Sequence, residues 1–163
     1  MSSGSNDLDN TIWRHWHLDL PNDRMAHLVR DTSRLLCKSL THRLSAHGVS
    51  FGHWAFLRIL WVKDGITQSE LSEQAGLMAP TTFSALKSME KNGYIYRERR
   101  EDNRKNIYIY LTPLGWSLKD TLSPLGEDVN QLALSGLSAH ELENMRKWLL
   151  VMINNLLHDP LLK

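Results

Sequence analysis

Apolar residues recur at helical spacing along most of this chain, and they alternate strictly with polar residues in only one region, between residues 94 and 112. The chain is therefore predicted to be mainly α-helical with one small β element. A long first helix is expected over residues 22–46, with Asn22 or Asp23 as its cap and His47-Gly48 as its end. Its apolar positions include Leu28, Leu35, Leu36, Leu40 and Leu44.

The middle of the chain predicts two helices in close succession. The first covers residues 51–62, after a possible cap at Ser50. The second covers residues 68–75, because Thr67 and Glu70 have the spacing of a capping box. Gly76 ends this second helix, since glycine readily takes the left-handed conformation of a helix C-terminus.

A fourth helix is predicted over residues 79–91. Pro80 suits a first helical turn, and Asn92-Gly93 is typical of a helix end. The inward-facing stripe of this helix is predicted to be Phe83, Leu86 and Met89. The residues left to face outward are then Thr81, Thr82, Ser84, Ala85, Lys87 and Ser88.

The alternating region predicts a β-hairpin. Its strands are expected over 94–99 and 107–112, around a charged tip at 101–105. A helix-turn-helix followed by such a hairpin is a winged helix, an architecture that grips duplex DNA. Basic residues outnumber acidic ones by two in this wing, namely Arg97, Arg99, Arg100, Arg104 and Lys105 against Glu98, Glu101 and Asp102.

Two more helices are predicted after the hairpin. Pro113 opens the first, which is expected to break or bend near Ser123-Pro124, and a capping box at Ser138 and Glu141 opens the second. The surplus apolar faces of the terminal helices favour a second copy of the chain as their partner. The predicted division is an N-terminal arm at 1–21, a dimerisation helix at 22–48, a winged helix-turn-helix at 49–112, and C-terminal dimerisation helices at 113–163.

Composition narrows the class of protein. A length of 163 residues fits one domain with helical extensions, and no apolar run reaches the length of a membrane span. A single cysteine, Cys37, excludes an internal disulfide and fits a cytoplasmic protein. Residues 1–10 are polar and lack the features of a signal peptide, so a disordered tail is expected there. A net charge of +1 says little about a polyanionic partner.

From about Val49 to Gly115, and in the order of the flanking helices, the chain resembles the MarR family of bacterial winged-helix transcription regulators. The matching residues are Trp54, Leu57, Leu60, the run 67–72, Leu86, Met89-Glu90, Gly93, Asp102, Arg104, Leu111-Thr112 and Gly115. The resemblance implies an α+β winged helix-turn-helix, mainly α with a β-hairpin wing. It also implies a homodimer formed by the first, fifth and sixth helices, and a repressor or activator of an inverted-repeat operator. Many members release DNA when a small, often aromatic or phenolic, ligand binds between the two regions.

The outward face of the fourth helix is the candidate base-reading surface, because an α-helix fits the major groove. Its residues are Pro80, Thr81, Thr82, Ser84, Ala85, Lys87 and Ser88. Many family members carry arginine in place of Ala85, which removes a guanine contact here. In the wing, Arg104 suits the minor groove, with Asp102 orienting its guanidinium. Arg97, Arg99 and Lys105 are the predicted phosphate contacts, and half-sites are expected about 10 bp apart.

Two aromatic groups raise the hypothesis of a ligand site. Trp13, His15, Trp16 and His17 precede the first helix, and Trp54, Arg58 and Trp61 share one stripe of the helix at 51–62. An arginine framed by indoles can hold the carboxylate of an aromatic acid, or a thioester of one. The alternative is that the tryptophans are core or interface anchors and that Arg58 extends to solvent.

Other functions remain open at this point. A metal sensor would use His15, His17, His53 and Cys37, and a redox sensor would use Cys37 alone. A winged helix can also serve protein–protein assembly without binding DNA. The chain has no phosphate-binding glycine loop, nucleophile elbow or HExxH helix, so no enzyme and no cofactor is predicted. The leading prediction is a transcriptional repressor that a small ligand releases from its operator.

Overall fold

The structure, a computed structural model, describes residues 25–162. The chain divides into two compact units at the bond between Ser39 and Leu40. Helix α2 (Met25–Ser45) begins in the first unit and ends in the second. The predicted cap at Asn22 or Asp23 lies outside the described residues, and the four-segment division of the chain stays a prediction.

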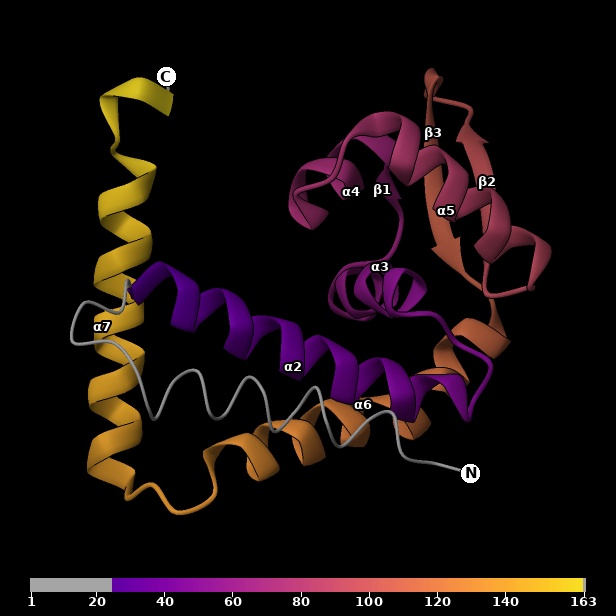
Figure 1. Cartoon of the computed structure of the whole chain (residues 1–163). Coiled ribbons are helices and arrows are strands. Elements are labelled where there is room, and N and C mark those ends of the chain that lie inside the picture. Colours follow the sequence, from indigo (N-terminus) through magenta and orange to yellow (C-terminus); the bar gives the residue numbers. More distant parts are fainter. Residues whose placement is uncertain (1–24, 163) are drawn as a thin grey trace. The chain divides into compact units, whose positions relative to one another are not determined.

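The second unit contains a winged helix-turn-helix followed by two long helices (Figure 1). Its elements are α3 (Phe51–Val62), β1 (Ile66–Thr67), α4 (Gln68–Ala75), α5 (Ala79–Lys91), β2 (Ile95–Arg100), β3 (Asn103–Leu111), α6 (Pro113–Leu134), α7 (Ala139–Leu157) and a 3-10 turn at Pro160–Leu162. The predicted fold class is confirmed.

Local capping explains why the helix boundaries agree with the sequence. The Ser50 hydroxyl accepts a hydrogen bond from the His53 backbone N–H at 3.1 Å at the start of α3. At the start of α4, Thr67 and Glu70 exchange the two bonds of a capping box, at 2.7 and 3.2 Å. The Thr67 backbone N–H and hydroxyl both donate to the Glu70 carboxylate, and these two bonds lower its pKa. Gly76 ends α4 with φ at 63°, as predicted.

Helix α3 lies at the centre of the core, packed against α4, α5, α6 and β3. Its apolar side chains meet those of the surrounding elements and leave almost no surface in water. The fully buried residues include Phe56, Leu57, Leu60, Ile66, Leu71, Leu86, Met89, Ile109 and Leu122. Burial of this size is the main force that holds the helix-turn-helix and the wing together.

The predicted inward stripe of α5 was wrong at one position. Thr82 is 0% exposed and Phe83 is 48% exposed, so the stripe is Thr82, Leu86 and Met89. Steps of three residues drift by about 60° each from the helical period, whereas a step of four followed by one of three stays on one face. The buried Thr82 hydroxyl donates to the Met78 carbonyl at 3.3 Å. Thr82 therefore cannot contact DNA as predicted.

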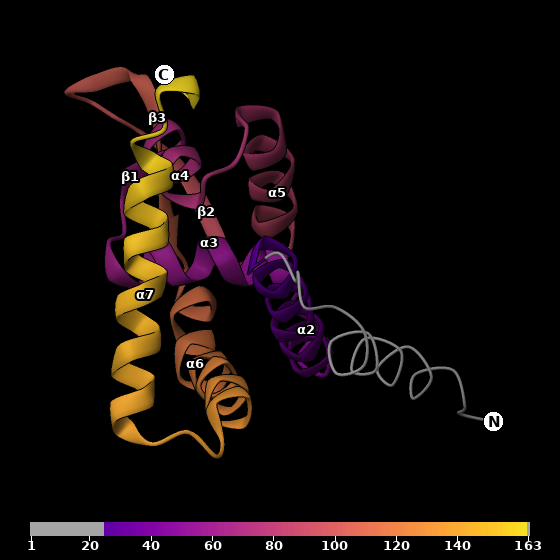
Figure 2. The same cartoon turned by 60° about the vertical axis from the view of Figure 1, so that its left-hand side comes forward.

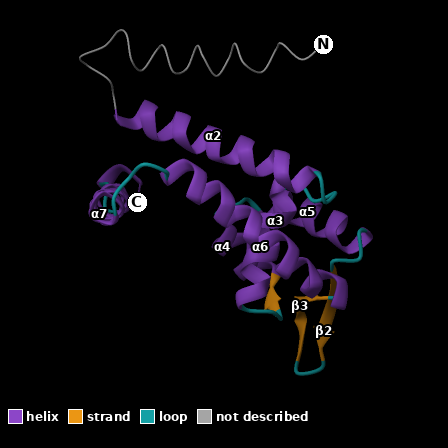
Figure 3. Ribbon diagram, turned by 90° about the horizontal axis from the view of Figure 1, so that it is seen from below, coloured by secondary structure: helices purple, strands orange, loops and turns teal. Residues whose placement is uncertain are grey.

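The sheet has three antiparallel strands in the order β1-β3-β2, one strand more than predicted. In the added pairing, Ile66 of β1 lies opposite Ile109 of β3. The hairpin tip is shorter than expected, because only Glu101 and Asp102 lie between the strands and Arg104 is part of β3. Seen from below, the hairpin projects away from the helices of its unit (Figure 3).

Helix α6 (Pro113–Leu134) continues through Pro124, so of the two predicted outcomes the break is wrong, and the bend near Ser123-Pro124 stays a prediction. Buried Leu122 and Val129 lie on either side of the proline and hold both parts of the helix against the core. Helix α7 begins with the predicted capping box at Ser138 and Glu141. No helix in the described part of the chain is long and apolar enough to cross a membrane.

Candidate nucleic-acid interface

Helix α5 presents a polar face to solvent between the turn at 76–78 and Lys91. The exposed residues are Pro80, Thr81, Ser84, Lys87 and Ser88, whereas Ala85 is half-buried. The buried stripe on the other side of α5 fixes the rotation of the helix about its axis. This face therefore carries hydroxyls and a lysine that can bond base edges or phosphates in a major groove.

Four cations of the wing are exposed: Arg99, Arg100, Arg104 and Lys105. The Arg99 guanidinium donates to the Arg104 backbone carbonyl at 3.3 Å, a bond that does not involve the Arg104 side chain. The predicted hydrogen-bonded pair between Asp102 and Arg104 is not formed among the described residues. Asp102 lies in the turn and Arg104 is the second residue of β3, so the two side chains need not meet.

Arg97 was predicted to contact phosphate, but it forms an ion pair with a residue of α5. Its Nε donates to Oε2 of Glu90 at 2.9 Å, and its Nη2 donates to the same oxygen. The guanidinium also lies 6.0 Å from the centre of the Phe83 ring. The bonds from Arg97 lower the pKa of Glu90, and the same pairing raises the pKa of Arg97. The pair is thus fully charged above the ordinary glutamate pKa and is lost only as pH falls through the lowered value.

Arg100 forms a second attachment of the wing, and the sequence analysis did not include it among the site residues. Its Nε donates to the Tyr110 hydroxyl at 2.8 Å, and its Nη2 donates to the Gly65 carbonyl at 3.1 Å. Its guanidinium lies 3.9 Å from the centre of the Tyr108 ring. The sequence did carry a signal for this role: an arginine in one predicted strand faces two alternating tyrosines in the other.

Asp64 joins the turn before β1 to the end of the wing. Its Oδ1 accepts from the Gly65 N–H at 2.7 Å and from the Leu111 N–H at 3.0 Å. At the same open end of the hairpin, the Thr112 hydroxyl donates to the Gly93 carbonyl at 2.5 Å. The wing is consequently fastened to the helices at several places along its length.

The candidate ligand residues on α3 are placed unequally. Trp54 and Trp61 are buried at 8% and 7% exposure, whereas Arg58 is exposed. The Arg58 guanidinium lies 4.8 Å from the centre of the Trp54 ring, and the Trp61 indole N–H donates to the Gly115 carbonyl at 2.9 Å. Trp61 is therefore a core anchor. Trp54 and Arg58 are in contact, as the hypothesis of a carboxylate site requires.

The other predicted ligand residues, Trp13, His15, Trp16 and His17, lie outside the described residues. Within residues 25–162, no three His, Cys, Asp or Glu side chains are grouped so that they could hold a metal ion. His53 is half-buried, and burial lowers its pKa. Cys37 is a half-buried free thiol on α2.

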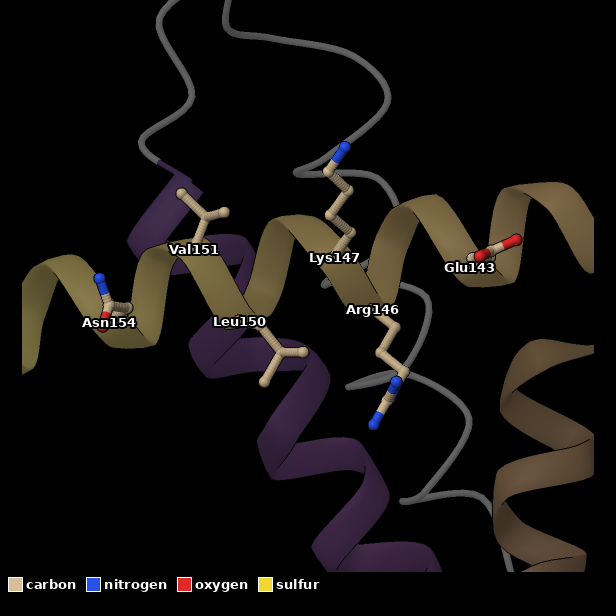
Figure 4. A pocket seen from close by; sticks show the side chains of 6 residues that line it. All are labelled: Glu143, Arg146, Lys147, Leu150, Val151 and Asn154. Atoms are coloured by element: carbon tan, nitrogen blue, oxygen red, sulfur yellow. The ribbon is translucent and has the colours of Figure 1, made fainter.

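One hollow of about 480 Å³ lies along α7. Its described lining side chains all come from this helix, as Figure 4 shows, so they mark a helix face and not an enclosed site. They are Glu143, Arg146, Lys147, Leu150, Val151 and Asn154.

Comparison with known proteins now identifies the winged helix. A sequence profile of the MarR family matches residues 49–107, which include α4, α5 and most of the wing. The winged helix-turn-helix of this chain is therefore similar to that of the MarR family. The chain is a DNA-binding transcriptional regulator, as the sequence predicted.

Curated relatives of this chain are transcriptional regulators, and solved structures share its fold. The organic hydroperoxide resistance transcriptional regulator of Bacillus subtilis is 27% identical over 140 residues, covering 86% of this chain and 93% of that protein. The regulator YwoH of the same organism is 27% identical over 88 residues, which span 54% of this chain and 64% of that protein. The crystal structure of an S. aureus MepR–DNA complex has the same fold, with a TM-score of 0.77, 23% identity, and coverage of 82% of this chain and 99% of that chain.

A glycine comparison tests whether the Arg100 attachment holds the wing. Gly65 and Gly76 both have positive φ, at 68° and 63°. A Cβ on Gly65 would lie 2.6 Å from Cε1 of Tyr110, whereas a Cβ on Gly76 would meet nothing within 4 Å. Gly76→Ala should cost about 1 kcal/mol of unfolding free energy from backbone strain alone. Gly65→Ala should cost roughly 1 to 3 kcal/mol more, measured by urea denaturation, and equal losses would contradict the attachment.

Proposed function

We propose that this regulator is a homodimer that represses transcription by occupying an inverted-repeat operator, and that a small aromatic acid releases it. The observation that carries the DNA-binding half of the proposal is the exposed polar face of α5 together with the exposed wing cations Arg99, Arg104 and Lys105. A helix for the major groove and a basic strand pair for the flanking phosphates or minor groove are the two parts that such a reader needs.

Each exposed residue has a role that follows from its chemistry. On α5, Thr81, Ser84 and Ser88 would bond base edges or phosphates, and the Ala85 methyl would touch a thymine methyl. Pro80 and Lys87 would pack against or pair with the backbone. On the wing, Arg104 would enter the minor groove, where negative potential is focused, with Arg99 and Lys105 on the adjacent phosphates.

The salt dependence of binding tests the wing directly. Binding to duplex DNA from upstream of the protein's own gene would be followed by fluorescence anisotropy over a series of salt concentrations. Arg104→Gln should weaken binding at least about tenfold and reduce the slope of log K against log salt by roughly 0.9. The control is Lys119→Gln on α6, which removes the same charge outside α5 and the wing. A winged helix used only for assembly would show no salt-dependent binding in any variant.

The homodimer is supported by the unpartnered surface of α7. None of its described side chains is buried, although the helix is rich in large apolar residues. The exposed ones are Trp148, Leu149, Leu150, Val151, Ile153, Leu156 and Leu157. So much apolar surface on one helix is unfavourable in water, and a second copy of the chain would cover it. Figure 2 shows α6 leading into α7 through a short loop, so the two consecutive helices could contribute to one interface.

A charge on α7 should separate the subunits. Trp148 is 62% exposed in the single chain, and an aromatic side chain of this size is a typical interface anchor. Trp148→Asp should raise the dimer dissociation constant at least about a hundredfold. Sedimentation equilibrium would measure it against the 18.8 kDa mass of the chain. Asn154→Asp adds the same charge at an exposed position on the polar side of α7 and should leave the dimer intact. A wild-type monomer at micromolar concentration would contradict the proposal.

The proposed effector site consists of Trp54 and Arg58. The guanidinium can pair with a carboxylate while an aromatic body stacks nearby. The Trp54 indole N–H is buried and has no hydrogen-bond partner in the described structure, so a polar atom of a ligand could satisfy it. A ligand would release DNA only by binding the released form more tightly.

Benzoate and benzamide distinguish a carboxylate sensor from a nonspecific effect. Benzoate should release operator DNA in the anisotropy assay, and neutral benzamide should not. Arg58→Gln should raise the benzoate concentration needed by about tenfold or more, because a charge-assisted hydrogen bond is lost. Lys63→Gln, another exposed cation at the end of α3, serves as the control. If benzoate and benzamide released DNA equally well, the proposed carboxylate site would be contradicted.

A redox-responsive regulator is the remaining candidate on the same scaffold. It is favoured by the name of the Bacillus subtilis relative, which concerns organic hydroperoxide resistance, together with the free thiol of Cys37. A hydroperoxide should then release the protein from DNA, and Cys37→Ser should abolish that release. This result would mean that the effector is an oxidant and not an aromatic acid.

A further inference from the structure

Two charged side chains connect the recognition helix to the wing. Glu90 lies in the last turn of α5, and Arg97 lies in β2, on the other side of the turn at 92–94. We infer that the ion pair of Glu90 and Arg97 fixes the position of the wing relative to α5, and that both are positioning residues for DNA binding. This inference rests on the proposed reading of DNA by α5 and the wing.

The geometry of the pair is that of a structural contact. Both donating nitrogens of Arg97 meet one carboxylate oxygen of Glu90, and the two side chains are only 23% and 37% exposed. Phe83, one helical turn before Lys87 on α5, places its ring under the same guanidinium. Two residues of the helix thus hold one residue of the strand, by hydrogen bonds on one edge and by the aromatic face.

A phosphate contact would require a different electrostatic arrangement. The charge of Arg97 is already balanced by Glu90, so the pair as a whole is neutral to an approaching phosphate. Moving Arg97 onto DNA would leave Glu90 as an unpaired negative charge beside the polyanion. The exposed Arg99, two residues along the same strand, pairs with no carboxylate among the described side chains and can serve the phosphate role instead.

Positioning matters because two separate elements must reach the DNA together. The wing and α5 contribute to affinity only if the angle between them matches the spacing of adjacent grooves. A hairpin held in place before binding loses less conformational entropy when the complex forms. The Arg100 attachment fixes the wing to the turn before β1, whereas the pair with Glu90 fixes it to the reading helix.

The two roles of Arg97 predict opposite effects of removing the acid. If Arg97 contacted phosphate, Glu90→Gln would free the arginine and remove a repulsive charge, so DNA binding would tighten. If the pair positions the wing, Glu90→Gln weakens binding although it makes the protein more positive. The salt slope gives a second distinction, because positioning residues release no counterions.

The experiment measures operator binding over a salt series for Glu90→Gln, Arg97→Gln, the double variant and the charge swap E90R/R97E. Each single variant should lose about tenfold in affinity, and the double variant should lose no more than either single one. The salt slope should stay as in the wild type, and the swap should recover most of the affinity. Arg99→Gln and Glu98→Gln are the controls: the first should reduce the slope by roughly 0.9, and the second should not weaken binding. Thermal melting would establish that every variant is folded.

Tighter binding by Glu90→Gln, additive losses, or a slope reduced by Arg97→Gln would overturn the inference. A distance measurement decides the matter even if the wild-type protein binds no DNA, which would be a failure of the proposed function alone. Spin labels at Lys87→Cys and Lys105→Cys in a Cys37→Ser background would report the separation of α5 and the wing. The distribution of distances should broaden in Arg97→Gln and narrow again in the swap, and an unchanged distribution would refute the positioning role.

Discussion

A hairpin of two strands is marginally stable in water by itself, so the DNA-facing half of this protein depends on how the wing is attached to the helices. Three attachments are formed by polar side chains. Asp64 accepts from the Leu111 N–H, Arg100 donates to the Gly65 carbonyl, and Arg97 donates to Glu90. The β1–β3 pairing adds a short third strand to the same region. The wing is thereby part of the folded unit before any DNA arrives.

This division of labour explains how a chain of net charge +1 can bind DNA. Of the basic residues in the wing, Arg97 and Arg100 bind other parts of the fold, and Arg99, Arg104 and Lys105 are left for the polyanion. A cation that is paired within the protein releases no counterion from DNA. The salt dependence of DNA binding by one subunit should therefore be modest. A dimer would double it and would also bring two recognition helices onto successive turns of one duplex.

The fold was predictable from the sequence where its causes are local. One capping box and Gly76 set the bounds of α4, and these signals lie within a residue or two of the helix ends. The strand β1 was missed because two residues have no period, and only their pairing with β3 makes them a strand. The inward position of Phe83 was predicted wrongly because residues three apart drift off one face of a helix. Thr82, Leu86 and Met89 stay on that face. The roles of Arg97 and Arg100 depend on partners brought close by the fold, and the sequence displays only their charge.

The central claim is that α5 and the anchored wing read DNA as one unit, in adjacent grooves, on each half of a symmetric site. Hydroxyl-radical footprinting of the wild-type protein on its upstream DNA tests this directly, because the radical reports the exposure of sugars along the minor groove. The account predicts two halves related by a dyad, each with a protected minor-groove segment flanking the segment occupied by the recognition helix. Protection without flanking minor-groove segments, or without a dyad, would contradict it.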